Sequence, residues 1–408
     1  MRAVTLDEAI RLALEVNPAA VAARSAVDNA EAGLLQARGA WLPNLTLGST
    51  FLNSSNQRFD QSTGRLVSKN YTAQANGSLE LFDGGRRLLD QRAASASVSA
   101  AEAGLESQRF LTALETTQIF YSAAAGGDLL GAAQRRLDRA NQQLEFAKTR
   151  LEVGTATRSD LLRAELEVGN AELAVVNAES DLQSAQLALG RQIGLAEPVA
   201  ATAAALPDRA PALPAADRLI ELATRGSPAV VAAEARWKSQ RAEKLSAYTP
   251  YLPSLRLTGG YDWFGFDFPP DQRSWSLRLL LNLPVFNGFQ REAAVQRAAA
   301  AERSAEATAK DALLAARTRV ESAVQAIRAA EKRVGISARA VDVAREDLRV
   351  QEERYQIGAA TILELQTSQV ALSDAEAQAV LARQALGLAV AELENVLGRT
   401  LTEIQGES

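Results

Sequence analysis

The sequence predicts a mainly α-helical protein with a β-barrel part, in which a strand hairpin followed by a long helical hairpin occurs twice. Three observations support this fold: an internal repeat, heptad patterns in long segments without proline, and four short segments of alternating apolar and polar residues. The repeat defines the order of the elements, the heptads predict the helices, and the alternation predicts the strands.

The internal repeat consists of four pairs of similar short segments. They are Asn17-Pro18-Ala19 with Ser227-Pro228-Ala229, Trp41-Leu42-Pro43-Asn44-Leu45 with Tyr251-Leu252-Pro253-Ser254-Leu255, Phe82-Asp83-Gly84 with Phe286-Asn287-Gly288, and Arg150-Leu151-Glu152-Val153-Gly154 with Arg354-Tyr355-Gln356-Ile357-Gly358. The offset is 210 positions in the first two pairs and 204 in the last two. We therefore expect one unit used twice: a first repeat over 1–196, an extended Ala/Pro-rich connector over 197–216, a second repeat over 217–399, and a C-terminal tail over 400–408.

Heptad patterns predict the helices. Apolar residues recur every seven positions with alanine between them, in the first repeat at Leu130, Leu137, Leu144 and Leu151, and in the second at Leu365, Leu372, Ala379, Leu386 and Leu393. Sustained heptads are typical of coiled-coil packing. We expect long helices over about 87–151 and 291–357, each roughly 100 Å long at 1.5 Å per residue. Shorter helices are expected over about 7–38 and 158–191.

Period-two alternation predicts four strands, over about 44–53, 71–82, 254–263 and 274–283. Each has about 10 residues, the length of a tilted strand that crosses a bilayer. The apolar set, which we expect to face lipid, includes Leu47, Leu79, Leu257 and Leu279. The polar set, expected to face a water-filled lumen, includes Thr46, Gln74, Asn76 and Arg278. Aromatic residues gather near the expected hairpin tips, where an interfacial girdle would lie.

Four strands cannot close a barrel, and an open edge in lipid leaves main-chain groups unsatisfied. The chain is therefore expected to share its barrel with copies of itself. Two copies would supply eight strands and three would supply twelve. About eight strands fill their interior with side chains, whereas larger barrels leave a channel. The polar faces of all four strands favour a homotrimer with a 12-stranded barrel.

Composition excludes several functions. The net charge of −5 argues against nucleic acid as a partner, because binding it requires a basic face, and the absence of cysteine and histidine removes thiolate and imidazole chemistry. A carboxylate enzyme would need paired acids in a pocket, but here the acids alternate with Arg and Lys, as on solvated helix faces. We expect neither an enzyme nor a cofactor.

Residues 1–5 lead directly into a predicted helix, so an exported protein would be represented here by its mature sequence. A soluble coiled-coil scaffold is the alternative, although it leaves the strands unexplained.

The duplicated hairpins, the Leu-Pro-x-Leu segments at Leu42 and Leu252 and the Val-Gly and Ile-Gly turns between helices together resemble the TolC-like outer-membrane efflux protein family over about residues 5–399. The resemblance implies a homotrimer in the outer membrane of a Gram-negative bacterium, with a 12-stranded barrel on an α-helical coiled-coil tunnel that extends into the periplasm. It also implies a passive exit duct of a tripartite efflux or type I secretion system, joined by a periplasmic adaptor to an inner-membrane pump of RND or ABC type. Drugs, metals and proteins all remain possible cargo.

The two helical turns are the expected working parts. Gly154 and Gly358 follow long helices, where glycine can adopt the left-handed conformation that ends a helix. A plain turn between antiparallel helices would explain both. The resemblance adds that adaptor hairpins dock at these tips, at Gly154 and Thr155 and at Gly358 and Ala359.

The resemblance also assigns the narrow entrance of the tunnel. Glu364 matches a position whose acids can ring the pore, while the second such position is Thr367 here, so we expect one ring and not two. Asp160 is the equivalent residue of the first repeat, where a solvated charge at a helix start is the alternative. Tyr355 matches a tip tyrosine that can lock onto the neighbouring hairpin's aspartate, Asp160. The companion basic position is Ala360, which implies a weaker lock.

Overall fold

The structure, a computed structural model, describes residues 2–60, 64–202 and 206–406. It forms two compact units, the first made of Met1–Ser25, Gly104–Val231 and Asp311–Ser408, and the second of Ala26–Ala103 and Ala232–Lys310. Each unit draws residues from both repeats. Within the described ranges, no helix combines the length and the apolar character needed to cross a membrane.

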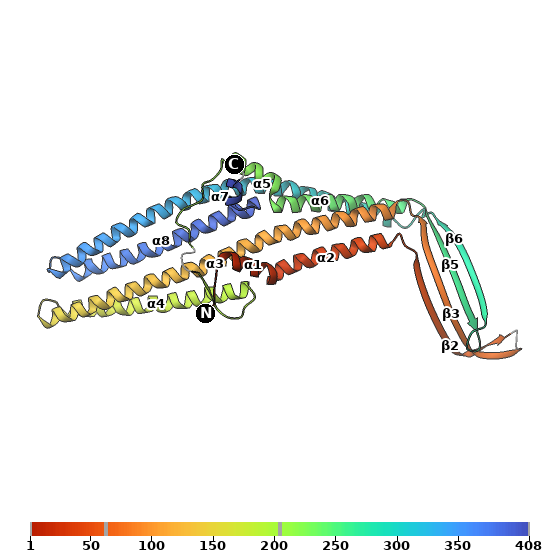
Figure 1. Cartoon of the computed structure of the whole chain (residues 1–408), viewed down its shortest axis with the longest axis horizontal. Helices are drawn as coiled ribbons and strands as arrows, with labels where there is room; N and C mark the ends of the chain where they lie inside the picture. Colours follow the sequence, from red (N-terminus) through yellow and green to blue (C-terminus); the bar gives the residue numbers. More distant parts are fainter. Residues whose placement is uncertain (1, 61–63, 203–205, 407–408) are drawn as a thin grey trace. The chain divides into compact units, whose positions relative to one another are not determined.

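The order of the elements follows the repeat (Figure 1). The first half contains β1 (Arg2–Val4), α1 (Leu6–Val16), α2 (Pro18–Gly39), β2 (Asn44–Asp60), β3 (Arg65–Phe82), α3 (Arg86–Glu152) and α4 (Arg158–Gln192). The second half contains β4 (Val199–Ala201), α5 (Ala216–Gly226), α6 (Pro228–Ser246), the short 3-10 helix η1 (Thr249–Tyr251), β5 (Ser254–Gly265), β6 (Gln272–Asn282), α7 (Gln290–Gln356), α8 (Ile362–Leu397) and α9 (Leu401–Gly406). The two predicted long helices are confirmed as α3 and α7, of 67 residues each.

The helix predicted over 7–38 is wrong in one respect, because the structure divides it into α1 and α2. Pro18 has no N–H and its ring disfavours helical geometry in the preceding residue. Asn17 accordingly adopts an extended conformation with ψ of 128°, and its Oδ1 accepts a hydrogen bond from the Ala19 N–H at 2.9 Å. Ser227, the equivalent residue before Pro228, has ψ of 127° and separates α5 from α6.

Two segments predicted without regular structure contain it. The connector over 197–216 includes β4, which pairs in parallel with β1 and aligns Val199 with Arg2. The expected tail over 400–408 contains α9, whose Leu401 and Ile404 are fully buried in the core of the first unit. Apolar anchoring therefore gives order to short segments that carry no long periodic pattern.

The second unit contains a four-stranded antiparallel sheet in the order β2-β3-β5-β6 (Figure 1). Its register aligns Leu79 with Leu257 and Leu257 with Leu279, and Thr46 with Asn76. Side chains alternate between faces along a strand, so the apolar set and the polar set of the prediction lie on opposite faces. β2 and β3 extend to Asp60 and Arg65, well into the loop that the sequence suggested. Which face meets lipid stays a prediction.

The first unit is held together by heptad positions. The interleaved alanines Ala140, Ala147, Ala164 and Ala171 are at most 2% exposed, and such small side chains let helices approach closely. Leucines complete the core, with Leu365, Leu386 and Leu393 fully buried in α8. The heptad pattern thus predicted both the helices and the residues along which they pack.

Candidate functional site

The tips of the two helical hairpins, α3–α4 and α7–α8, have the same main-chain geometry. Gly154 and Gly358 have φ of 75° and 78°. In the residue after each glycine, the N–H donates back to the last turn of the helix: Thr155 to the Arg150 carbonyl and Ala359 to the Arg354 carbonyl, both at 2.8 Å. No atom would crowd a Cβ at Gly154, so the left-handed conformation, and not lack of space, favours glycine there. The tips predicted from the sequence are therefore formed as glycine-ended turns.

Each turn continues into a capping box at the start of the next helix. In α8 the Glu364 Oε2 accepts hydrogen bonds from the Thr361 N–H at 2.6 Å and from its hydroxyl at 2.9 Å, while the Glu364 N–H donates to Thr361 Oγ1 at 3.3 Å. In α4 Thr157 and Asp160 form the same set of bonds. The hydrogen bonds from the Thr361 N–H and hydroxyl lower the pKa of Glu364 below its usual value. Glu364 and Asp160, the predicted entrance acids, thus both cap the start of a helix.

Sequence reasoning missed the two threonines, although the pattern Thr-x-x-Asp/Glu at a helix start is a recognised signal for this motif. Thr367, one turn beyond Glu364, donates its hydroxyl proton to the Leu363 carbonyl at 2.8 Å. The side chain of Thr367 therefore bonds to its own helix.

Tyr355 lies between the two hairpins of the first unit. Its side chain is 5% exposed, and its ring centroid lies 6.0 Å from that of Phe146 on α3. The Arg150 guanidinium lies 4.9 Å from the same centroid and donates to the Tyr355 carbonyl at 2.7 Å. Arg150 and Phe146 are contacts that sequence reasoning missed, because only the fold brings α3 and α7 together at this level.

The Tyr355 hydroxyl is buried and has no hydrogen-bond partner among the described residues. Burial raises the pKa of Tyr355 above its usual value; the positive charge of Arg150 opposes this increase and the negative charge of Asp160 adds to it. Asp160 uses Oδ2 for its capping box. The predicted lock between Tyr355 and Asp160 stays a prediction.

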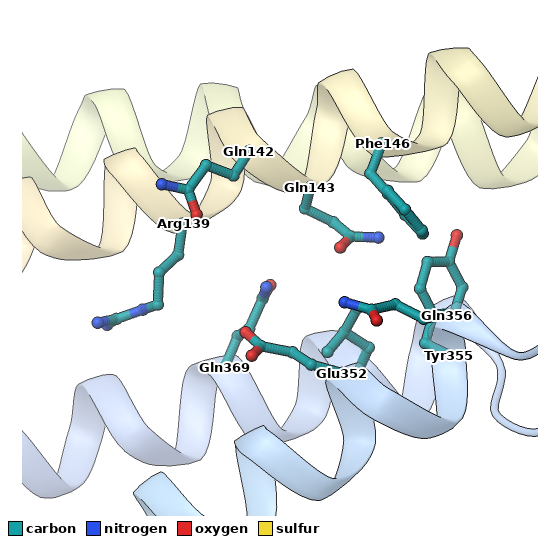
Figure 2. Close-up of a pocket in the computed structure, with 9 residues that line it drawn as sticks. Arg139, Gln142, Gln143, Phe146, Glu352, Tyr355, Gln356 and Gln369 are labelled. Atoms are coloured by element: carbon teal, nitrogen blue, oxygen red, sulfur yellow. The ribbon is translucent and has the colours of Figure 1, made fainter.

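A polar pocket of about 190 Å³ lies beside Tyr355, between α3 and the α7–α8 hairpin (Figure 2). It is lined by Arg139, Gln142, Gln143, Phe146, Glu352, Tyr355, Gln356, Leu365 and Gln369. Burial raises the pKa of Glu352, which Arg139 partly offsets. Arg139 Nε and Gln143 Nε2 are buried without a hydrogen-bond partner in the described chain. Unpaired buried polar groups weaken a contact between elements, so this part of the contact between the hairpins is weak.

Other polar contacts also join the two hairpins. Arg135 and Arg139 of α3 lie 3.6 and 3.8 Å from a carboxylate oxygen of Glu376 on α8. Gln366 of α8 donates to the Arg163 carbonyl of α4 at 3.1 Å. In residues 2–60, 64–202 and 206–406, no cluster of three or more acidic residues is placed to hold a metal ion.

Paired long helical hairpins and a sheet with one apolar and one polar face define a class of protein: the mainly helical outer-membrane proteins of TolC-like architecture. The model of the outer membrane efflux protein family matches residues 9–195 and 219–399, so the chain belongs to this family. Family membership places it at the outer membrane of a Gram-negative bacterium, with a part that extends into the periplasm.

Individual relatives agree with this assignment. The chain is 28% identical to the cobalt-zinc-cadmium resistance protein CzcC of Cupriavidus metallidurans over 70% of its own length and 64% of that protein. It is 29% identical to Protein CyaE of Bordetella pertussis over 76% and 66% of the two lengths. The crystal structure of the outer membrane protein VceC of Vibrio cholerae has the same fold, with a TM-score of 0.79 and 19% identity over 97% of this chain and 96% of VceC.

Proposed function

We propose that the chain is the outer-membrane exit duct of a tripartite efflux or type I secretion system. The observation that carries the proposal is the four-stranded sheet with opposite apolar and polar faces, continuous in sequence with two long helical hairpins. β2 and β6 are the edges of this sheet, and pairing between the edges of three copies would close a 12-stranded barrel. The duct is passive and needs no cofactor. The family match favours this function over a soluble coiled-coil scaffold.

The hairpin tips are the proposed docking sites for a periplasmic adaptor, which links the duct to an inner-membrane pump of RND or ABC type. At both tips an apolar residue precedes the glycine and is exposed: Val153 by 69% and Ile357 by 81%. Exposed apolar groups at equivalent turns favour contact with a protein partner. Gly154 and Thr155 in one tip, and Gly358 and Ala359 in the other, would form the main-chain surface beside them.

At the tunnel entrance, we propose that Glu364 supplies one acidic ring, with Asp160 contributing charge from the other hairpin and Thr367 replacing a second acid. Tyr355 and Asp160 are the proposed lock of the closed state. The lowered pKa of Glu364 supports a charged ring at neutral pH, and the free hydroxyl of Tyr355 leaves a donor for the lock.

Reconstitution of the purified chain in planar bilayers tests the duct. We expect stepwise ion conductance of uniform size, and a protein that remains soluble without detergent and conducts no ions would contradict the proposal. The absence of native cysteine permits single-cysteine variants Thr155→Cys and Ala359→Cys to be cross-linked to the adaptor encoded beside the gene. Leu314→Cys, on α7 and distant in sequence from both tips, serves as the control that should give no adduct.

A further inference from the structure

The corner that follows β6 contains a strained residue. After β3 the chain turns through Gly84 and Gly85, with φ of 68° and 82°, and after β6 it turns through Gly288 and Phe289, with φ of 68° and 64°. Phe289 is the only residue other than glycine with positive φ in the described chain. An L side chain in this region crowds the following carbonyl, and a bulky one is a genuine outlier. The second repeat therefore keeps an aromatic side chain where the first repeat has glycine.

The strained conformation displays an aromatic pair on the surface. The rings of Phe286 and Phe289 meet edge to face, with centroids 5.4 Å apart, yet they remain 71% and 68% exposed. Leu283 and Val285, just before them, are 57% and 83% exposed. We call Leu283, Val285, Phe286 and Phe289 the corner patch.

Hydrogen bonds hold the corner in place beneath the patch. The Arg291 guanidinium donates to the carbonyls of Pro284 and Val285 at 2.7 and 3.0 Å and lies 4.6 Å from the centroid of the Tyr251 ring. The main chain that carries the patch is thus fixed by an arginine that is itself only 8% exposed. The exposed rings are not the result of a loose loop.

The patch lies between an apolar surface and a charged helix. Before it, Leu277, Leu279 and Leu281 of β6 are 60 to 69% exposed on one face of the strand. After it, α7 begins with Gln290, Arg291 and Glu292. Along the chain, an apolar strand is followed by an aromatic pair and then by a charged helix. This order matches the order of environments from the lipid core through the headgroups to water.

We propose that the corner patch inserts into the periplasmic leaflet of the outer membrane, with phospholipid at the level of the headgroups and upper acyl chains as its occupant. Phe289 has a strained main chain although its side chain is exposed, and strain of this kind indicates that the side chain has a function. The first corner has only one such ring, because Phe82 is 50% exposed there but Gly85 takes the place of Phe289. The proposal rests on the proposed function, in which the sheet spans the membrane.

Spin labelling of the full chain tests this proposal. The absence of native cysteine allows a nitroxide to be attached at Phe286→Cys and, separately, Phe289→Cys, in protein reconstituted in vesicles of phosphatidylethanolamine and phosphatidylglycerol. Molecular oxygen partitions into lipid, whereas a neutral nickel chelate stays in water. We expect oxygen to relax both labels several-fold more than the nickel chelate does.

Two control positions separate the possible failures. Leu279→Cys, on the apolar face of β6, should also favour oxygen, and Leu314→Cys, farther along α7, should not. A nickel preference at Leu279→Cys would overturn the proposed function itself. Oxygen preference at Leu279→Cys combined with nickel preference at both patch positions would overturn only the present proposal. Protection of both patch positions from both reagents would also overturn it, because a second copy of the chain would then cover the patch.

Discussion

At the start of α8, the Glu364 carboxylate accepts two hydrogen bonds from Thr361 and is also the proposed source of charge at the tunnel entrance. The substitution Glu364→Gln removes the charge and keeps an oxygen that can accept from the Thr361 N–H. We therefore expect a lower preference for cations and weaker block by multivalent cations, with trimer assembly unchanged, in single-channel recordings. Like charges in a narrow space favour cations, so unchanged selectivity would mean that Glu364 only caps its helix.

Thr361→Ala is the matched control, because it removes the cap and keeps the acid. It should destabilise the start of α8 by about 1 kcal/mol and leave cation preference intact. Titration gives a second check. Because the pKa of Glu364 is lowered, its charge and the stability that it adds are present above the ordinary value of 4.5 and are lost only as pH falls below it. Cation preference should therefore have its midpoint below pH 4.5; a midpoint above this value would indicate repulsion between converging carboxylates.

Phe289 offers a test of backbone strain. A left-handed conformation costs roughly 1–2 kcal/mol for a residue other than glycine. Replacement by glycine removes this strain, but glycine loses more conformational entropy on folding, which offsets part of the stabilisation. Phe289→Gly should therefore raise the free energy of unfolding by roughly 0.5–1 kcal/mol, measured by urea unfolding in detergent. Phe286→Gly is the control, because Phe286 has no positive φ and its replacement should give no increase.

At the scale of the element, the register of the sheet makes a sharp prediction. Leu279 and Ser276 lie on opposite faces of β6, aligned with Leu257 and Gly260 of β5. If the apolar face meets lipid, Leu279→Arg should cost about 2–4 kcal/mol near the bilayer centre, and Ser276→Arg far less. Folding titrations into lipid vesicles measure both costs. Equal costs would show that the assignment of the two faces is wrong.

The contact between the hairpins is tested through the Tyr355 hydroxyl. Among the described residues the hydroxyl has no hydrogen-bond partner, so Tyr355→Phe should change the free energy of unfolding by less than about 1 kcal/mol. If the hydroxyl locks the closed state through Asp160, the same variant should raise the conductance of the resting channel. Tyr121→Phe, which removes a half-buried hydroxyl elsewhere in the first unit, should leave conductance unchanged. A resting conductance equal to that of the parent in both variants would argue against the lock.

Elements with a long regular pattern were predictable from the sequence, and isolated contacts were not. The heptads of α3 and α7 and the alternation in β5 and β6 extend over many residues, so many positions indicate the same periodicity and hence the same type of element. The break at Asn17 depends on one proline, Pro18, within a segment whose pattern is otherwise helical. At the tips, the glycines and the acids carried a local signal, whereas Arg150 and the polar pocket depend on contacts between residues about 200 positions apart.

For the whole molecule, closure of the sheet requires copies of the chain. β2 and β6 each have one unpaired edge within the described sheet, and unpaired edges in lipid are not tolerated. We expect the protein in mild detergent to have the mass of three chains, measured by light scattering corrected for detergent. A monomer or dimer that still conducts ions would contradict the 12-stranded barrel.

The difference between the two corners has a geometric consequence for such a trimer. The internal repeat and the three-fold axis together place six strand-to-helix corners around the circumference, and the Phe289 corner alternates with the glycine corner. Phe82 is half-exposed in the glycine corner, but only three of the six corners carry the Phe286–Phe289 pair. Three points define a plane, so three such aromatic pairs, inserted at the same depth, would set the tilt and the height of the duct in the bilayer.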